Sequence, residues 1–143
     1  MIKVHTGTLL MLAALASCGS ASVTGDIVGV YSAEGAELRV ARQGDRLTAT
    51  VTGNRAANGA AADCEVRAIG DLVGNTLVAQ FIAFDAETFA YGEQSASADR
   101  RQLEIVFEDG RAVLKRIDID AYCGVGARLV GTYQQDAPRG EPG

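Results

Sequence analysis

The chain has 143 residues and a formal net charge of −5, from 13 Lys and Arg against 18 Asp and Glu, with one His and no Trp. This length suits a single domain. The acidic balance argues against a nucleic-acid-binding protein, which needs a basic surface, so no nucleic-acid partner is expected.

The first 17 residues have the composition of a secretory leader. Lys3 lies near the start, and an apolar run, LLMLAALA, extends from Leu9 to Ala16. That run is far shorter than the roughly 20 residues that a membrane-spanning helix needs. A cation, a short apolar run and a small-residue exit are typical of a signal peptide. The alternative is a buried N-terminal helix or strand.

The exit from this leader reads Leu15-Ala16-Ser17-Cys18 and resembles the lipobox of bacterial lipoproteins. The resemblance implies cleavage after Ser17 and acylation, palmitate included, of Cys18. Two or more acyl chains give stable membrane anchoring. Since Gly19 rather than Asp follows the cysteine, the family rule implies the outer membrane. The periplasmic face is expected, and the cell surface stays open. Residues 18–25 then form a tether.

Two cysteines remain once Cys18 is assigned to lipid. Export would place Cys64 and Cys123 in an oxidising compartment, where a disulfide forms. The bridge would close a loop of roughly 59 residues and stabilise the fold by roughly 4 kcal/mol. Buried free thiols or a metal pair are the alternatives. With His5 removed with the leader and no third cysteine, a zinc site is not expected.

Period-two alternation of apolar and polar residues dominates the middle of the chain and predicts β-hairpins. Turn signals lie at residues 43–45, 70–75 and 108–110, the last containing Asp109-Gly110, a strong hairpin signal. The predicted strand pairs are Glu37–Arg42 with Arg46–Thr52, Cys64–Ala68 with Thr76–Ala83, and Gln102–Phe107 with Arg111–Ile119.

Two further strands are predicted at the ends of the domain, over Asp26–Ser32 and Ala127–Gln134. Both carry an aliphatic-Val-Gly-x-Tyr pattern. We expect them to pair and close the sheet, with a bend at each glycine; chance similarity is the alternative. About eight strands predict an all-β domain, a small antiparallel barrel or sandwich with one disulfide, over residues 26–134. Residues 135–143, which hold both prolines, are expected to be a disordered tail.

The chain carries no signature of an enzyme. Without a histidine after the leader, the usual base of a nucleophilic triad is missing, and Lys115 is expected to be a solvated strand residue. The pairs Asp85/Glu87 and Asp118/Asp120 have a spacing that permits acid–base chemistry or calcium binding. Neither matches a calcium-binding loop, so solvated residues are the preferred interpretation. No catalytic activity, cofactor or metal is expected.

The segment 84–101 is the strongest candidate for a partner-binding site, because long connections are often functional. It combines the acids Asp85, Glu87 and Glu93 with the aromatics Phe89 and Tyr91, which are expected to be exposed. Aromatics are common at interface hot spots, and acids steer a basic partner. The alternative is that the aromatics fold back on the core.

A second candidate is the turn at residues 120–126, where Tyr122 would be displayed beside the disulfide. Its alternative is a purely structural turn. Both candidates fit a non-enzymatic module that binds another protein.

In size, anchor, strand count and acidity the chain resembles small lipid-anchored lysozyme inhibitors, although no inhibitory motif transfers residue by residue. This resemblance implies an inhibitor of a basic, peptidoglycan-cleaving cell-wall hydrolase. Two other functions stay open. One is an assembly accessory of an outer-membrane complex. The other is a small barrel that binds an apolar ligand, with Ala49, Ala68, Ala79 and Ala112 facing inward.

Overall fold

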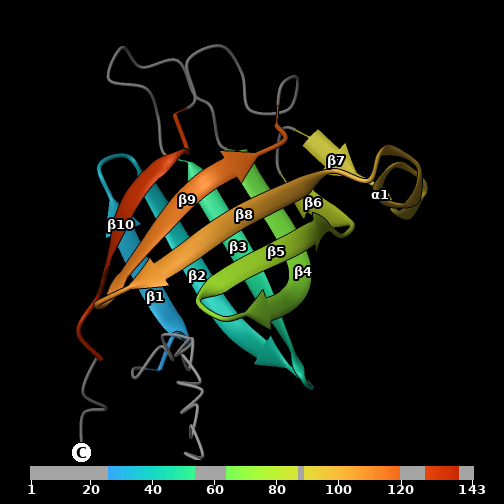
Figure 1. Ribbon diagram of the computed structural model, residues 1–143. Coiled ribbons are helices and arrows are strands. Elements are labelled where there is room, and N and C mark those ends of the chain that lie inside the picture. Colours follow the sequence, from blue (N-terminus) through green and yellow to red (C-terminus); the bar gives the residue numbers. More distant parts are fainter. Residues whose placement is uncertain (1–25, 54–63, 87–88, 120–127, 139–143) are drawn as a thin grey trace, which may run out of the picture.

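Eight antiparallel strands close into a barrel in the computed structural model, which describes residues 26–53, 64–86, 89–119 and 128–138 (Figure 1). Each strand pairs with its neighbours in the chain and the last pairs with the first, so the barrel runs up and down without crossovers. The predicted all-β domain of about eight strands is confirmed, and it is a barrel rather than a sandwich. Its strands are β1 (Gly29–Ala33), β2 (Ala36–Gln43), β3 (Arg46–Gly53), β4 (Cys64–Val73), β5 (Thr76–Phe81), β8 (Gln102–Glu108), β9 (Arg111–Ile117) and β10 (Gly131–Gln135).

The three predicted hairpins are present, with shifted bounds. They are β2–β3, β4–β5 and β8–β9. The second differs most, because β4 extends to Val73 and leaves only Gly74 and Asn75 for the turn. In the third, Asp109 and Gly110 both have positive φ, 46° and 73°, which a two-residue type I′ turn requires.

The barrel interior is filled by its own apolar side chains, as an eight-stranded barrel permits. Alternate residues of each strand point inward, and all four alanines predicted to do so are fully buried. Small and large side chains alternate across the strands: Ala112 lies in register between Phe107 on β8 and Tyr133 on β10. This alternation lets the inward rows interlock without strain.

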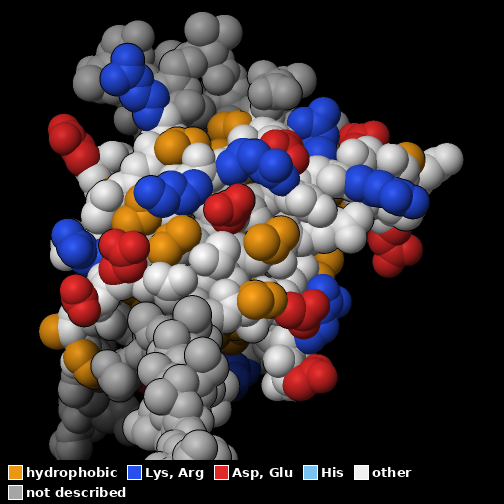
Figure 2. All heavy atoms as spheres, viewed as in Figure 1, with side chains coloured by type: hydrophobic (Ala, Val, Ile, Leu, Met, Phe, Trp, Pro, Cys, Tyr) orange, Lys and Arg blue, Asp and Glu red, His pale blue; other side chains and the backbone are white. Residues whose placement is uncertain are grey.

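The outer surface over β5, β8 and β9 mixes apolar and charged side chains, and no single kind of side chain covers it (Figure 2). Among the described residues, the most exposed large apolar side chains are Val73 at the end of β4 and Val130 just before β10, at 77% and 57%. Single exposed aliphatic residues are normal on soluble surfaces and do not by themselves mark a binding site.

The predicted pairing of the two terminal strands is confirmed. Tyr31 and Ser32 of β1 lie opposite Gln135 and Gln134 of β10. The shared sequence pattern gives the same local structure twice. Gly29 and Gly131 both have φ of 156°, and each tyrosine hydroxyl donates to the carbonyl four residues earlier. The terminal strands are therefore equivalent closing elements.

The predicted start of the disordered tail at residue 135 is wrong. Gln135 belongs to β10, and the Asp136 amide donates to the Val30 carbonyl at 2.8 Å. The Gln135 side chain also donates to the Asp26 carbonyl at 3.0 Å. These contacts hold Gln135 and Asp136 at the barrel seam, which is the pairing of β1 with β10.

The two ends of the barrel differ in their connections. One end carries the tight turns at 44–45, 74–75 and 109–110, together with the start of β1 and the end of β10. At the other end lie the turn at 34–35 and the strand ends joined by residues 54–63, 82–101 and 118–130. In Figure 1 the start of β1 and the end of β10 lie toward the bottom of the barrel, and β6 and β7 lie at its upper right. The start of β1 and the end of β10 therefore lie at the opposite end of the barrel from the segment that follows β5.

The buried tyrosines of the seam predict alkaline sensitivity. Burial, aided by the charge of Asp26, raises the pKa of Tyr31 to about 12, and burial raises the pKa of Tyr133 to about 12, against an ordinary value of 10.0. A pKa that is higher in the folded state gives stability that is complete below about pH 10 and is lost as the pH rises through 12. We expect the free energy of unfolding to fall over this range.

The double variant Y31F/Y133F should lose about 1 kcal/mol per hydrogen bond at pH 8, and its free energy of unfolding should decline less steeply at alkaline pH. An unchanged decline in that variant would contradict this origin.

Gly70 predicts a second stability effect. A Cβ at this position would lie 2.0 Å from the Val78 carbonyl oxygen and 2.5 Å from Ala79 Cα, both backbone atoms of the paired strand β5. We expect Gly70→Ala to lower the free energy of unfolding by about 3 kcal/mol, measured by chemical denaturation. The control is Gly92→Ala, where the same Cβ meets nothing within 4 Å. Equal effects of the two substitutions would exclude a steric cause.

Candidate functional site

The predicted partner-binding segment leaves the barrel after β5 and returns at β8. We call residues 82–101 the rim segment. It contains the hairpin β6 (Phe84–Ala86) and β7 (Phe89–Tyr91), followed by the short helix α1 (Glu93–Asp99). The expectation of an irregular loop here is wrong. The helix has no side-chain N-cap and only seven residues, so the sequence lacks the signals that normally reveal one.

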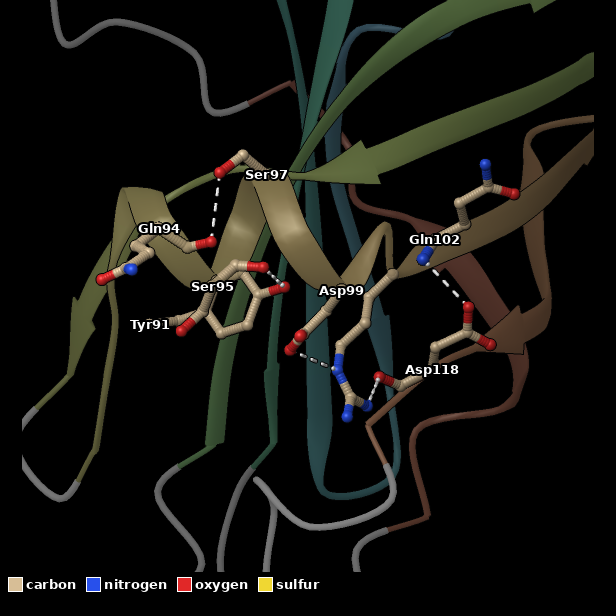
Figure 3. A network of polar contacts seen from close by, with 8 residues as sticks. Tyr91, Gln94, Ser95, Ser97, Asp99, Gln102 and Asp118 are labelled. Carbon is tan, nitrogen blue, oxygen red and sulfur yellow. Dashed lines mark hydrogen bonds and ion pairs between the residues drawn. The ribbon is translucent and has the colours of Figure 1, made fainter.

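Tyr91 anchors the rim segment to the barrel. The prediction that it is displayed at the surface is wrong, and the alternative, that the aromatics fold back on the core, is confirmed for this residue. Its side chain is 1% exposed. The ring stacks on Phe84 at 5.4 Å between centroids and meets Phe81, the last residue of β5, edge-on at 6.0 Å. Its hydroxyl donates to the Ser95 carbonyl in α1 at 3.2 Å (Figure 3). Packing of the Tyr91 ring against two phenylalanines buries more apolar area than display at the surface would. It also holds the hairpin and the helix together.

Two of the predicted acidic residues are presented to solvent. Asp85 on β6 and Glu93 at the start of α1 are both exposed. Glu87 and the side chain of Phe89 lie outside the described part of the structure. The two described acids therefore project from a segment whose inner face is held by aromatic packing. A rigid support of this kind lowers the entropic cost of binding.

A polar network closes the base of the rim segment (Figure 3). Asp118, just after β9, accepts the Gln102 amide at 3.0 Å through its carboxylate, and its backbone carbonyl accepts Arg101 Nη1 at 2.8 Å. Arg101 Nε also pairs with Asp99 at 3.4 Å. These contacts join the end of α1 and the start of β8 to the end of β9.

The network also explains Asp118, which the sequence offered as half of a carboxylate pair. Its carboxylate accepts a backbone amide and lies 3.6 Å from Arg116, so it acts as a structural acceptor. Asp120 lies outside the described residues. Sequence reasoning missed the network because Arg101 and Asp118 become neighbours only through the register of β8 and β9, which alternation does not specify.

Cys64 is buried at the start of β4, opposite Gly53. Its predicted partner Cys123, the neighbouring Tyr122 and the predicted lipidation site Cys18 lie outside the described residues. The disulfide, the display of Tyr122 and the lipid anchor therefore stay predictions.

Over the described ranges no three His, Cys, Asp or Glu side chains are grouped as metal ligands, and every buried side-chain nitrogen or oxygen has a hydrogen-bond partner. No helix in the same ranges is long and apolar enough to cross a membrane.

Comparisons with models of protein families, with curated proteins and with solved structures found no match to this chain. Function therefore has to be inferred from the positions and chemistry of its own residues.

Proposed function

We propose that this protein is a lipid-anchored envelope lipoprotein that binds a protein partner through the rim segment. The partner class we propose is a basic peptidoglycan-cleaving enzyme, which the barrel would inhibit without chemistry of its own. The observation that carries the proposal is that Asp26, where the described chain begins, and the rim segment lie at opposite ends of the barrel.

The geometry relates directly to the anchor predicted at Cys18. Asp26, where the described chain begins, follows Cys18 by eight positions and leads into the tight-turn end of the barrel. Eight residues span at most about 28 Å. A chain lipidated at Cys18 would therefore hold its tight-turn end near the membrane and direct the rim segment away from it, toward partners.

The exposed acids of the rim segment support a basic partner, and Arg100 and Arg101 at its end offset part of the negative charge. Asp85 and Glu93 are exposed on elements that Tyr91 and Phe84 fix in place. Exposed carboxylates accelerate encounter with an oppositely charged surface, and this acceleration weakens as salt screens it. Asp85 and Glu93 thus support a role in association with a partner more than a role in catalysis.

The interior supports the apolar-ligand alternative less well. Small inward residues such as Ala49 and Ala68 would widen a cavity, but large rings occupy the same interior. Tyr31 and Phe107 lie 5.9 Å apart between ring centroids, and both are buried. These rings fill volume that a ligand would otherwise need.

The anchor is tested with Cys18→Ser in the full chain expressed in a Gram-negative bacterium. We expect the wild type in the membrane fraction with a lipid mass on its N-terminal peptide, and the variant without that mass and outside the membrane fraction. Cys123→Ser is the control and should leave lipidation unchanged. An unmodified wild-type Cys18 in mass spectrometry would refute the anchor.

The partner is tested with residues 19–143, which contain every barrel strand. Titration into lysis assays with several unrelated muramidases should give stoichiometric inhibition of one class. In the triple variant D85N/E87Q/E93Q, association with that enzyme should slow about tenfold at low salt and lose most of its salt dependence.

The matched control for this experiment is D45N/E108Q/D109N, which removes the same charge at the tight-turn end. It should leave association nearly unchanged. If both triple variants behave alike, net charge and not the rim segment governs binding. If a folded domain inhibits no muramidase class, the inhibitor function is wrong, and crosslinking in the native envelope becomes the test of an assembly role.

A further inference from the structure

A hollow of about 510 Å³ lies on the outside of the barrel, over β2, β3 and β4. The outside of a closed barrel is generally convex, so a hollow there needs a cause. The cause is the path of the chain after Phe81, where β5 ends and Ile82 continues alongside β4. The Ile82 amide donates to the Arg67 carbonyl at 3.0 Å, and Ile82 lines the hollow. The connection to the rim segment thus forms one wall.

The floor of the hollow consists of two short rows of side chains that cross the three strands. Residues directly opposite in register point to the same side of a sheet. One row carries two guanidiniums around a hydroxyl, and the next carries two carboxylates around a hydroxyl. In register these rows are Arg39–Thr50–Arg67 and Glu37–Thr52–Glu65.

The groups in these rows keep most of their hydrogen-bonding capacity. Arg39 Nη2 pairs with Glu37 at 3.3 Å, and Arg67 Nε pairs with Glu65 at 2.7 Å. Each pair uses one nitrogen of a guanidinium that has five N–H groups. Exposed pairs of this kind contribute little to stability, so a ligand can compete with them at small cost.

The hydroxyls between these charges are also available. The hydroxyl of Thr48, two residues before Thr50 on β3, donates to the Ala41 carbonyl at 3.3 Å. For Thr50 and Thr52, in contrast, the described part of the chain provides no side-chain hydrogen-bond partner. A ligand in the hollow would therefore meet one hydroxyl in each row.

We propose that this hollow binds an extended peptide segment that carries an acidic and a basic side chain two residues apart. The acid would lie over the Arg39–Thr50–Arg67 row and the base over the Glu37–Thr52–Glu65 row. Adjacent rows are two residues apart along a strand, about 6.7 Å, which is also the distance between side chains i and i+2 of an extended peptide. The spacing of the ligand charges thus matches the spacing of the rows.

The arrangement disfavours ligands of a single charge sign. Two arginines and two glutamates give the hollow no net charge, so a simple anion or cation gains no long-range attraction. An anion over the arginine row would also lie close to the carboxylates of the neighbouring row. Only a ligand with both charges at the right separation satisfies both rows. This inference is independent of the proposed anchor and rim function.

The experiment is an NMR titration of residues 19–143 with the blocked peptide Ac-Thr-Glu-Thr-Lys-Thr-NH2. We expect amide shifts confined to β2, β3 and β4. The isomer Ac-Thr-Glu-Lys-Thr-Thr-NH2 has the same composition but places the two charges on opposite faces of an extended chain, and it should bind at least about fivefold more weakly. Equal shifts from both peptides, or no shifts in these strands, would overturn the proposal.

Variants separate the two rows. R39Q/R67Q and E37Q/E65Q should each weaken binding of the first peptide about tenfold, because each removes one of the two charge contacts. The control R111Q/K115Q removes two exposed positive charges from β9 and should leave binding unchanged. If this control weakens binding as much as R39Q/R67Q, the hollow is not the site.

Discussion

Pairing of β1 with β10 is the contact on which the rest of the barrel depends, because it joins the two ends of the chain and removes both free edges of the sheet. Bringing such distant residues together costs chain entropy that only a cooperative set of contacts offsets. The seam has that set: ladder bonds continue to Asp136, the Gln135 side chain reaches Asp26, and Ser32 pairs with Asp136 at 3.1 Å. In each of the two strands, a buried tyrosine hydroxyl donates to the carbonyl of the residue four positions earlier, before the strand begins. Closure is thus made by two copies of one short motif.

Closure also makes the two ends of the barrel different from each other. With an even number of strands running up and down, the first strand starts and the last strand finishes at the same end. Three tight turns occupy that end, and the other end has the turn at 34–35 and the three longer connections. The rim segment takes its position from the barrel core, since Tyr91 packs on Phe81, a core residue at the end of β5. The position of a candidate binding surface thus follows from strand count and from one aromatic contact.

Alternation along the strands was sufficient to predict the hairpins, the inward alanines and the paired terminal strands, because each depends on residues near in sequence or on a repeated motif. The same alternation did not predict the features that depend on packing between residues far apart in the sequence. Tyr91 has the sequence surroundings of an exposed loop residue, and only the proximity of Phe81 and Phe84 makes burial favourable. Helix α1 has no cap signal. The aligned arginines of β2 and β4 depend on the register of two hairpins, which fixes Arg39 and Arg67 opposite Thr50. Alternation places side chains on a face but does not say which of them share a row.

The rim segment and the hollow on β2–β4 have a common structural origin. Both arise where the chain leaves the barrel after Phe81: Ile82 forms a wall of the hollow, and the next residues form β6 of the rim segment. They differ in charge, since the rim segment exposes the acids Asp85 and Glu93, whereas the two rows of the hollow hold two arginines and two glutamates and have no net charge. A partner that first meets the rim segment would therefore bring its own extended segments close to the hollow. In the proposed roles, the rim segment would steer a partner and the neighbouring hollow would select an extended segment by the spacing of its charges.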